Sequence, residues 1–258
     1  MKENLISRLR YLEKNEDITI LMAAVTGSHS FGLSSVQSDY DVRFIYVHND
    51  KRSYLSLSQP VEVIQVKEGV FDMEGWDLFK SSRLTLKSNP ALFELFQSPI
   101  RLITHPDYFR KMTGLIADCY SKKALGHHYY RMMSDNLQQV TKTRGSERKE
   151  LKIWVQVYRS YLTLEYIIQR GSLPPLSVWE LLDSVSTDQG MKNRMTRIFK
   201  AKEMEECISN DEGENNVSLI VGKSLSIKNE ITRLHQGKNM EMELNELIWA
   251  ILEWGVMR

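Results

Sequence analysis

The sequence has few of the features that mark membrane, secreted or polyanion-binding proteins. Its 258 residues include only two cysteines, Cys119 and Cys207, too few for a disulfide framework or a thiolate metal site. A net charge of +1 gives no overall field to attract nucleic acid or membrane. No apolar run approaches the roughly 18 residues of a membrane span, and the charged N-terminal residues lack the apolar core of a signal peptide. We therefore expect a cytoplasmic protein.

The first hundred residues mix helical and strand patterns. The runs ITILMAAV (18–25) and YDVRFIYV (40–47) are short and rich in β-branched and aromatic residues, which predicts buried strands. VEVIQV (61–66) and VFDME (70–74) flank the turn signal Glu68-Gly69 and predict a hairpin or two consecutive strands. From Trp76 the spacing becomes helical, and Asn89-Pro90 ends that helix and begins PALFELFQ (90–97).

After residue 105 the apolar spacing is almost wholly helical, with breaks at Gly171 and at Pro174-Pro175. The sequence shows neither an internal repeat nor a long low-complexity tract. These patterns predict an α+β protein with two domains. We expect a small mixed-sheet domain at residues 1–104 and a C-terminal α-helical domain at residues 105–258.

Two aspartates flank one tyrosine at the start of the strand predicted over 40–47. Side chains at positions i and i+2 of a strand leave the same face, so Asp39 and Asp41 project together and Tyr40 points the other way. Two adjacent carboxylates repel each other and are costly to desolvate unless a cation lies between them. Carboxylate oxygens are the ligands that Mg²⁺ prefers, and substrate phosphates commonly complete its shell. The pair therefore predicts a metal site.

Gly27-Ser28 follows the strand predicted over 18–25 and is expected to open a short helix. Such a junction offers backbone N–H groups and a hydroxyl to an anion. A Gly-Ser pair alone is more often a simple turn, and an Asp-x-Asp pair alone is more often a solvated strand end. Their order along this chain, a phosphate cradle followed by a two-carboxylate strand, favours phosphoryl or nucleotidyl transfer.

The stretch GSHSFGLSSVQSDYDVR (27–43) resembles the signature of the DNA polymerase beta-type nucleotidyltransferase superfamily. Within it, the chain is most similar to the YcgL-like, RNA-ligase-associated branch, which FDMEGWDLFK (71–80) and LKSNPALFELFQSPI (86–100) also resemble. The resemblance covers residues 20–100 well and the helical half more loosely. His29, Ser30 and Phe31 depart from the Arg-Ala-Tyr of the branch. The resemblance implies a nucleotidyltransferase-fold domain followed by a helical domain, with the active site in a cleft between them.

The resemblance also implies a third carboxylate on a neighbouring strand, and three acids compete for that role. Asp72 matches the strand aspartate that precedes the aromatic residue and the helix. Glu74 shares its face by the period of two, and Asp77 is expected in the first turn of the next helix, where an acid suits the helix dipole. We favour Asp72.

By this resemblance, the chain would be a nucleotidyltransferase using two Mg²⁺ ions, for which Mn²⁺ could substitute. It would transfer a nucleoside monophosphate from a nucleoside triphosphate such as ATP to a hydroxyl acceptor, and an RNA end is one candidate acceptor. The implied catalytic and metal-binding residues are Asp39, Asp41 and Asp72. The implied nucleotide-binding residues are Gly27, Ser28 and Lys80, which matches a family lysine. Arg159 is a further candidate from its own setting, because arginine is rarely buried without a partner and this one lies within an aromatic and aliphatic helix.

Other functions remain open at the level of sequence. One alternative is a transferase that modifies a protein, as in toxin–antitoxin pairs, and another is a non-catalytic nucleotide- or RNA-binding module. Basic residues from Lys122 to Lys152 could attract an RNA backbone, although such a run is usually a solvated helix face. The sequence gives no sign of a membrane partner or of DNA specificity.

Overall fold

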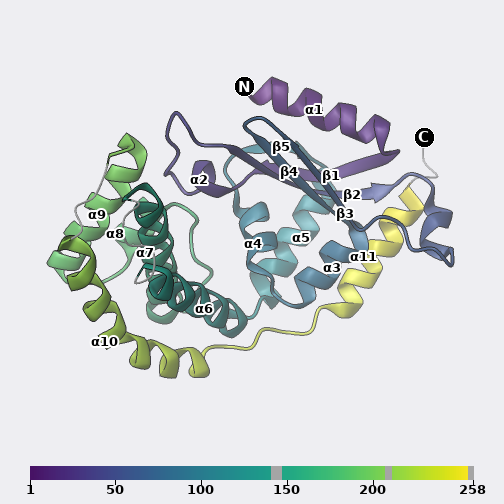
Figure 1. The fold of residues 1–258 in the computed structure, drawn as a ribbon. Helices are drawn as coiled ribbons and strands as arrows, with labels where there is room; N and C mark the ends of the chain where they lie inside the picture. Colours follow the sequence, from purple (N-terminus) through teal and green to yellow (C-terminus); the bar gives the residue numbers. More distant parts are fainter. Residues whose placement is uncertain (141–146, 207–210, 255–258) are drawn as a thin grey trace. The chain divides into compact units, whose positions relative to one another are not determined.

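The structure of this protein is a computed structural model that describes residues 1–140, 147–206 and 211–254 (Figure 1). Five strands form one mixed sheet in the order β3-β4-β2-β1-β5, in which β2 and β4 are parallel and the other neighbours are antiparallel. The strands are β1 (Ile18–Val25), β2 (Tyr40–His48), β3 (Val63–Glu68), β4 (Phe71–Asp77) and β5 (Arg101–Thr104). The predicted α+β class is confirmed.

The chain divides into two compact units. The sheet unit comprises the described residues of Met1–Ser30, Asp39–Tyr120 and Gly237–Arg258, and the helical unit comprises those of Phe31–Ser38 and Ser121–Gln236. The units group the chain differently from the predicted domains, because residues 105–120 and the C-terminal segment lie in the sheet unit. Residues Phe31–Ser38, which we call the signature loop, lie in the helical unit.

In the sheet unit, α1 (Lys2–Asn15) covers one face of the sheet. Leu5, Leu9 and Leu12 recur at helical spacing and are buried against inward-facing strand residues, among them Val42 and Met73. Burying an aliphatic side chain of this size contributes roughly 1.5–3 kcal/mol. This core fixes which residues of β2 and β4 face α1, and it leaves their alternate neighbours for the opposite face.

Figure 1 shows the helices α3 (Leu78–Leu86), α4 (Pro90–Gln97) and α5 (Pro106–Cys119) on the other side of the sheet. Asn89 caps α4 by accepting a hydrogen bond from the Ala91 N–H at 2.9 Å, and Pro90 occupies the first turn, as predicted. The helix expected from Trp76 begins two residues later, because Trp76 and Asp77 complete β4. The C-terminal helix α11 (Glu241–Trp254) contacts α3, and η1 (Lys51–Leu55) follows β2.

The helical unit is built on a long pair of helices, α6 (Lys122–Val140) and α7 (Glu147–Arg170), that pack along each other. Tyr129, Trp154, Tyr158 and Tyr161 are buried within it. Its other helices are α8 (Val178–Ser184), α9 (Gln189–Met204) and α10 (Asp211–Arg233). Of all the helices that the structure describes, none is both long enough and apolar enough to cross a membrane.

Gly75 provides a test of the packing between β4 and β2. Gly75 lies opposite Phe44 in the parallel register, and a Cβ on Gly75 would overlap the buried Phe44 ring. We expect Gly75→Ala to lower the free energy of unfolding by about 1–3 kcal/mol, because overpacking a rigid core is costly. Chemical denaturation of the purified protein measures this change.

Gly114 supplies the matched control, since it lies in α5 with open space around the position of a Cβ. Gly114→Ala should raise the free energy of unfolding by up to about 1 kcal/mol, because alanine has the higher helix propensity. If Gly75→Ala stabilised the protein as Gly114→Ala does, the close contact between Gly75 and Phe44 would be wrong.

Candidate active site

The parallel pairing of β2 and β4 places Asp41 directly opposite Asp72. Val42 and Met73 point into the α1 core, so Asp41 and Asp72 both leave the opposite face of the sheet. Asp41 is half-buried, and the Asp72 side chain is 38% exposed. Asp39 precedes the strand and is exposed. The structure thus brings together the second aspartate of the Asp-x-Asp pair and the favoured strand acid.

Gly27 lies against the Asp41 carboxylate. Its backbone has a φ of +65°, which favours glycine. A Cβ at this position would also overlap the Asp41 carboxylate. The Thr26 N–H donates a hydrogen bond to the Asp41 carbonyl at 2.7 Å and fixes the end of β1 against β2. Ser28 follows in the short helix α2 (Gly27–Ser30) and is half-buried. The predicted phosphate-binding turn is therefore next to Asp41.

The electrostatics of Asp41 reflect this crowded setting. Partial burial raises the pKa of Asp41 above its ordinary range, and the charges of Asp72 and Asp39 raise it further. The Arg43 guanidinium lowers the pKa of Asp41 and offsets part of this effect. The ionised carboxylate of Asp41 is thus less stable here than in water.

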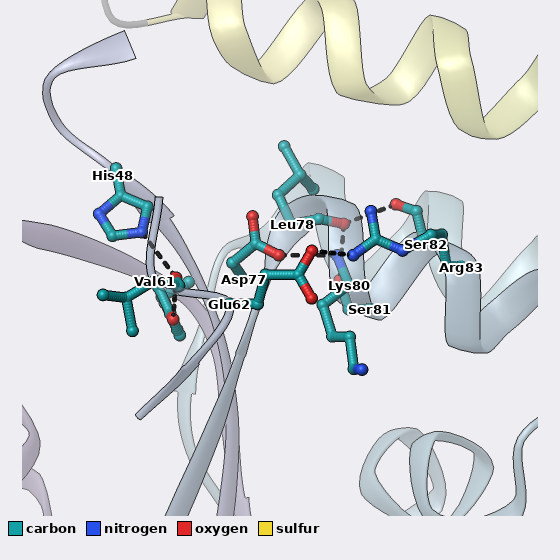
Figure 2. A network of polar contacts seen from close by, with 10 residues as sticks. His48, Val61, Glu62, Asp77, Leu78, Lys80, Ser81, Ser82 and Arg83 are labelled. Atoms are coloured by element: carbon teal, nitrogen blue, oxygen red, sulfur yellow. Dashed lines mark hydrogen bonds and ion pairs between the residues drawn. The ribbon is translucent and has the colours of Figure 1, made fainter. Parts of the chain in front are cut away.

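The other two candidates for the third carboxylate are engaged elsewhere. Glu74 accepts a hydrogen bond from the Trp76 indole at 3.0 Å, a contact that Asp72 lacks, although both acids pair with Arg43. Asp77 lies five residues beyond Asp72, which is about 16 Å along a strand. It caps α3 by accepting from the Lys80 N–H at 2.7 Å and is 1% exposed (Figure 2). Asp77 thus has a structural role at the far end of β4.

Lys80 belongs to the Asp77 end of the strand. Its backbone N–H completes the cap of α3, and its ammonium group extends away from the Asp77 carboxylate (Figure 2). Burial raises the pKa of Asp77, and the N–H groups at the start of the helix partly offset this shift. A role of Lys80 in nucleotide binding stays a prediction.

Arg159 lies in the helical unit, where it is only 5% exposed. Its guanidinium carbon is 4.0 Å from the centre of the Phe31 ring, a cation–π contact, and Nη2 lies 3.8 Å from the Met132 sulfur. The Gly32 carbonyl next to Phe31 accepts from the Trp179 indole at 3.0 Å. Arg159 therefore holds the start of the signature loop, and its predicted contact with a nucleotide stays untested.

Part of the basic run lies outside the described residues. This holds for Lys142 and Arg144 and for the side chain of Arg148. The run therefore stays a prediction as an RNA contact.

Arg43 is the site residue that the sequence reasoning missed. Its Nη1 lies 3.3 Å from Asp72 Oδ1, and its Nη2 lies 3.7 Å from Glu74 Oε2. The period of two along a strand could have identified it, because Arg43 lies two residues after Asp41 and so shares its face. Its partners on β4 become visible only once the register is known.

The donor set suits a cation held by two carboxylates. Among the residues that the structure describes, no three Asp, Glu, His or Cys side chains are grouped closely enough to hold one ion. Mg²⁺ needs only one or two protein carboxylates when phosphates and water complete its shell. Asp41 and Asp72, opposite each other beside the Gly27 turn, meet that requirement.

Asp41→Asn tests the cost of this charge. Because the pKa of Asp41 is raised in the folded protein, the folded state binds this proton more tightly than the unfolded state does. That contribution to stability is present below the ordinary value of 3.8 and is lost as the pH rises through the folded pKa. Without metal, Asp41→Asn should therefore raise the melting temperature at pH 7, and the gain should shrink towards pH 4.

Asp50→Asn is the matched control at the other end of β2. The Arg52 side chain lowers the pKa of Asp50, so its charge is favoured in the folded state, and asparagine can still cap η1. This variant should show no gain at pH 7. A gain of equal size in both variants would mean that the environment of Asp41 is not unusual.

Comparison with known proteins agrees with these observations. The sequence model of the RNA repair pathway DNA polymerase beta family (RlaP) matches residues 1–249. The chain is 30% identical over 265 residues to the uncharacterized protein YcgL of Bacillus subtilis (strain 168), and the alignment covers 98% of this chain and 97% of that protein.

Among solved structures, the chain is similar to a nucleotidyltransferase-like protein from Exiguobacterium sibiricum 255-15. The identity is 12% and the TM-score 0.33, over 89% of this chain and 75% of that one. That structural similarity is too low to bear on function. The family match over residues 1–249 is decisive, and the chain belongs to the RNA repair pathway DNA polymerase beta family.

Proposed function

We propose that this protein is an Mg²⁺-dependent nucleotidyltransferase that transfers a nucleoside monophosphate from a nucleoside triphosphate to a hydroxyl acceptor. The observation that supports it most directly is the register that sets Asp41 opposite Asp72 on adjacent parallel strands, with Gly27 against Asp41. Two half-buried carboxylates beside a Gly-Ser turn are costly to the fold. A bound cation would offset that cost, and nucleotide phosphates would complete its coordination shell. Nucleoside triphosphates are abundant in the cytoplasm, where we propose that the protein acts.

The chain's own residues divide the work between binding and proton transfer. Asp41 and Asp72 would hold Mg²⁺, with Asp39 close enough for its charge to act on Asp41. When bound, two such ions stabilise the attacking and leaving oxygens of an in-line displacement. Ser28 and the backbone of Gly27 would orient the triphosphate. Asp72, whose side chain is 38% exposed, would accept the proton of the acceptor hydroxyl.

We further propose an RNA end as the acceptor. The support is the RNA repair pathway in the description of the family to which the chain belongs. A protein hydroxyl is the alternative acceptor, and it would make the chain a protein-modifying transferase. A non-catalytic nucleotide- or RNA-binding module is the other alternative, which the paired carboxylates disfavour.

The direct test is to incubate the purified full-length protein with each labelled nucleoside triphosphate, Mg²⁺ and either RNA or a cell lysate. We expect label on RNA and release of pyrophosphate. Asp41→Asn should lower the rate by more than about 100-fold, because metal stabilisation of the transition state is worth several kcal/mol. Excess chelator should abolish transfer.

Asp50→Asn serves again as the control, since it makes the same chemical change at the opposite end of β2 and should keep wild-type activity. Label on protein instead of RNA would identify the alternative acceptor. Transfer that survives Asp41→Asn or chelation would rule out the metal-dependent mechanism. Nucleotide binding without any transfer would favour the binding module.

A further inference from the structure

Arg43 lies within a block of four charged side chains on one face of the sheet. Asp41 and Arg43 are neighbours along β2 by the period of two, and their partners across β4 are Asp72 and Glu74. The block contains three carboxylates and one guanidinium, so its formal charge is −2. Arg43 is the cation within this block, and its side chain is 22% exposed. Lys67 lies opposite Asp72 on the other neighbouring strand, β3, and is exposed.

The two carboxylates that pair with Arg43 are not equivalent. Glu74 is fixed by the indole N–H of Trp76 at 3.0 Å, and Trp76 is itself only 6% exposed. Asp72 is more exposed and lies opposite Asp41. Arg43 Nη1 also donates to its neighbouring Val42 carbonyl at 3.3 Å, which keeps the guanidinium close to the strand. Glu74 is thus a fixed anchor for Arg43, whereas Asp72 is a partner that another cation can take.

We propose that Arg43 is a positioning residue that holds Asp72 while no metal ion is bound and competes with Mg²⁺ for this carboxylate. Glu74 retains the guanidinium when Asp72 turns to the ion. The balance between these pairs then sets the Mg²⁺ affinity of the site. This inference rests on the proposed function only in taking Asp72 as a metal ligand.

The physical basis is competition between two cations for one carboxylate. Arginine side chains remain protonated in proteins, so a metal ion has to compete with a charged guanidinium. Mg²⁺ must break the contact between Arg43 and Asp72 and also bear the repulsion of a nearby positive charge. If Arg43 only stabilised the structure, removing it would loosen the site and weaken Mg²⁺ binding. If Arg43 competes with the ion, removing it strengthens Mg²⁺ binding.

The test is titration calorimetry of the full-length protein with Mg²⁺ alone. Arg43→Gln should tighten binding roughly five-fold, the effect of an ion pair worth just under 1 kcal/mol. Glu74→Gln should weaken binding, because glutamine still accepts from Trp76 but releases Arg43 to Asp72. It also keeps the proposal testable if Arg43→Gln does not fold.

Arg83→Gln is the matched control, since Arg83 pairs with Glu62 on the surface of the same unit. It should leave Mg²⁺ binding unchanged. Weaker or unchanged binding by Arg43→Gln, or tighter binding by Glu74→Gln, overturns the proposal. So does a wild-type protein that binds no Mg²⁺. Because the transfer assay is separate, wild-type transfer alongside any of these results would leave the proposed function standing.

Discussion

The register between β2 and β4 is the constraint on which the proposed site depends. After β2 the chain runs through η1 to the edge strand β3, and it reverses at Gly69, whose φ is +58°. β4 then returns between β3 and β2, parallel to β2. A shift of one residue would turn Asp72 into the α1 core and expose Met73. The hydrophobic pattern that stabilises the fold therefore also places the carboxylates.

Holding these acids together costs free energy, and the structure offsets that cost locally. Asp41 lies beside Gly27, and its burial, together with the charges of Asp72 and Asp39, raises its pKa and disfavours its ionised form. Arg43 is the counterion that the fold supplies from within the same strand. On β2 and β4 one guanidinium faces three carboxylates, and we propose that a metal ion supplies further positive charge there. Stability and function are thus linked through the same few side chains.

The sequence predicted the parts of the fold that rest on local patterns. The strand at 18–25 and the helix at 90–97 have the expected bounds, because apolar runs, Asn caps and Pro at the first helical turn are local signals. The strand Arg101–Thr104 was missed because four residues give no periodicity. The helical pattern begins at Trp76, but in the structure Trp76 belongs to β4 and Asp77 caps the helix that follows. The capping role of Asp77 becomes visible only in the folded structure.

The candidate site also has features that local sequence predicts and features that depend on the fold. The spacing of Asp39 and Asp41 predicts a common face, but Asp39 lies just before β2, so only Asp41 is placed by the strand. The resemblance to the family favours Asp72, which the register sets opposite Asp41. The pairing of Arg43 with Asp72, 29 residues away, depends on strand register, which no local pattern encodes. Asp77 and Lys80 sit at the other end of β4 from Asp72, a separation that sequence proximity concealed.

A crystal structure of the protein with Mg²⁺ and a non-hydrolysable nucleoside triphosphate would test the central claim most directly. We predict an ion bound by oxygens of both Asp41 and Asp72, with the triphosphate beside Ser28 and with Asp72 released from Arg43. An ion bound elsewhere, or a nucleotide bound while Asp72 keeps its contact with Arg43, would contradict the account.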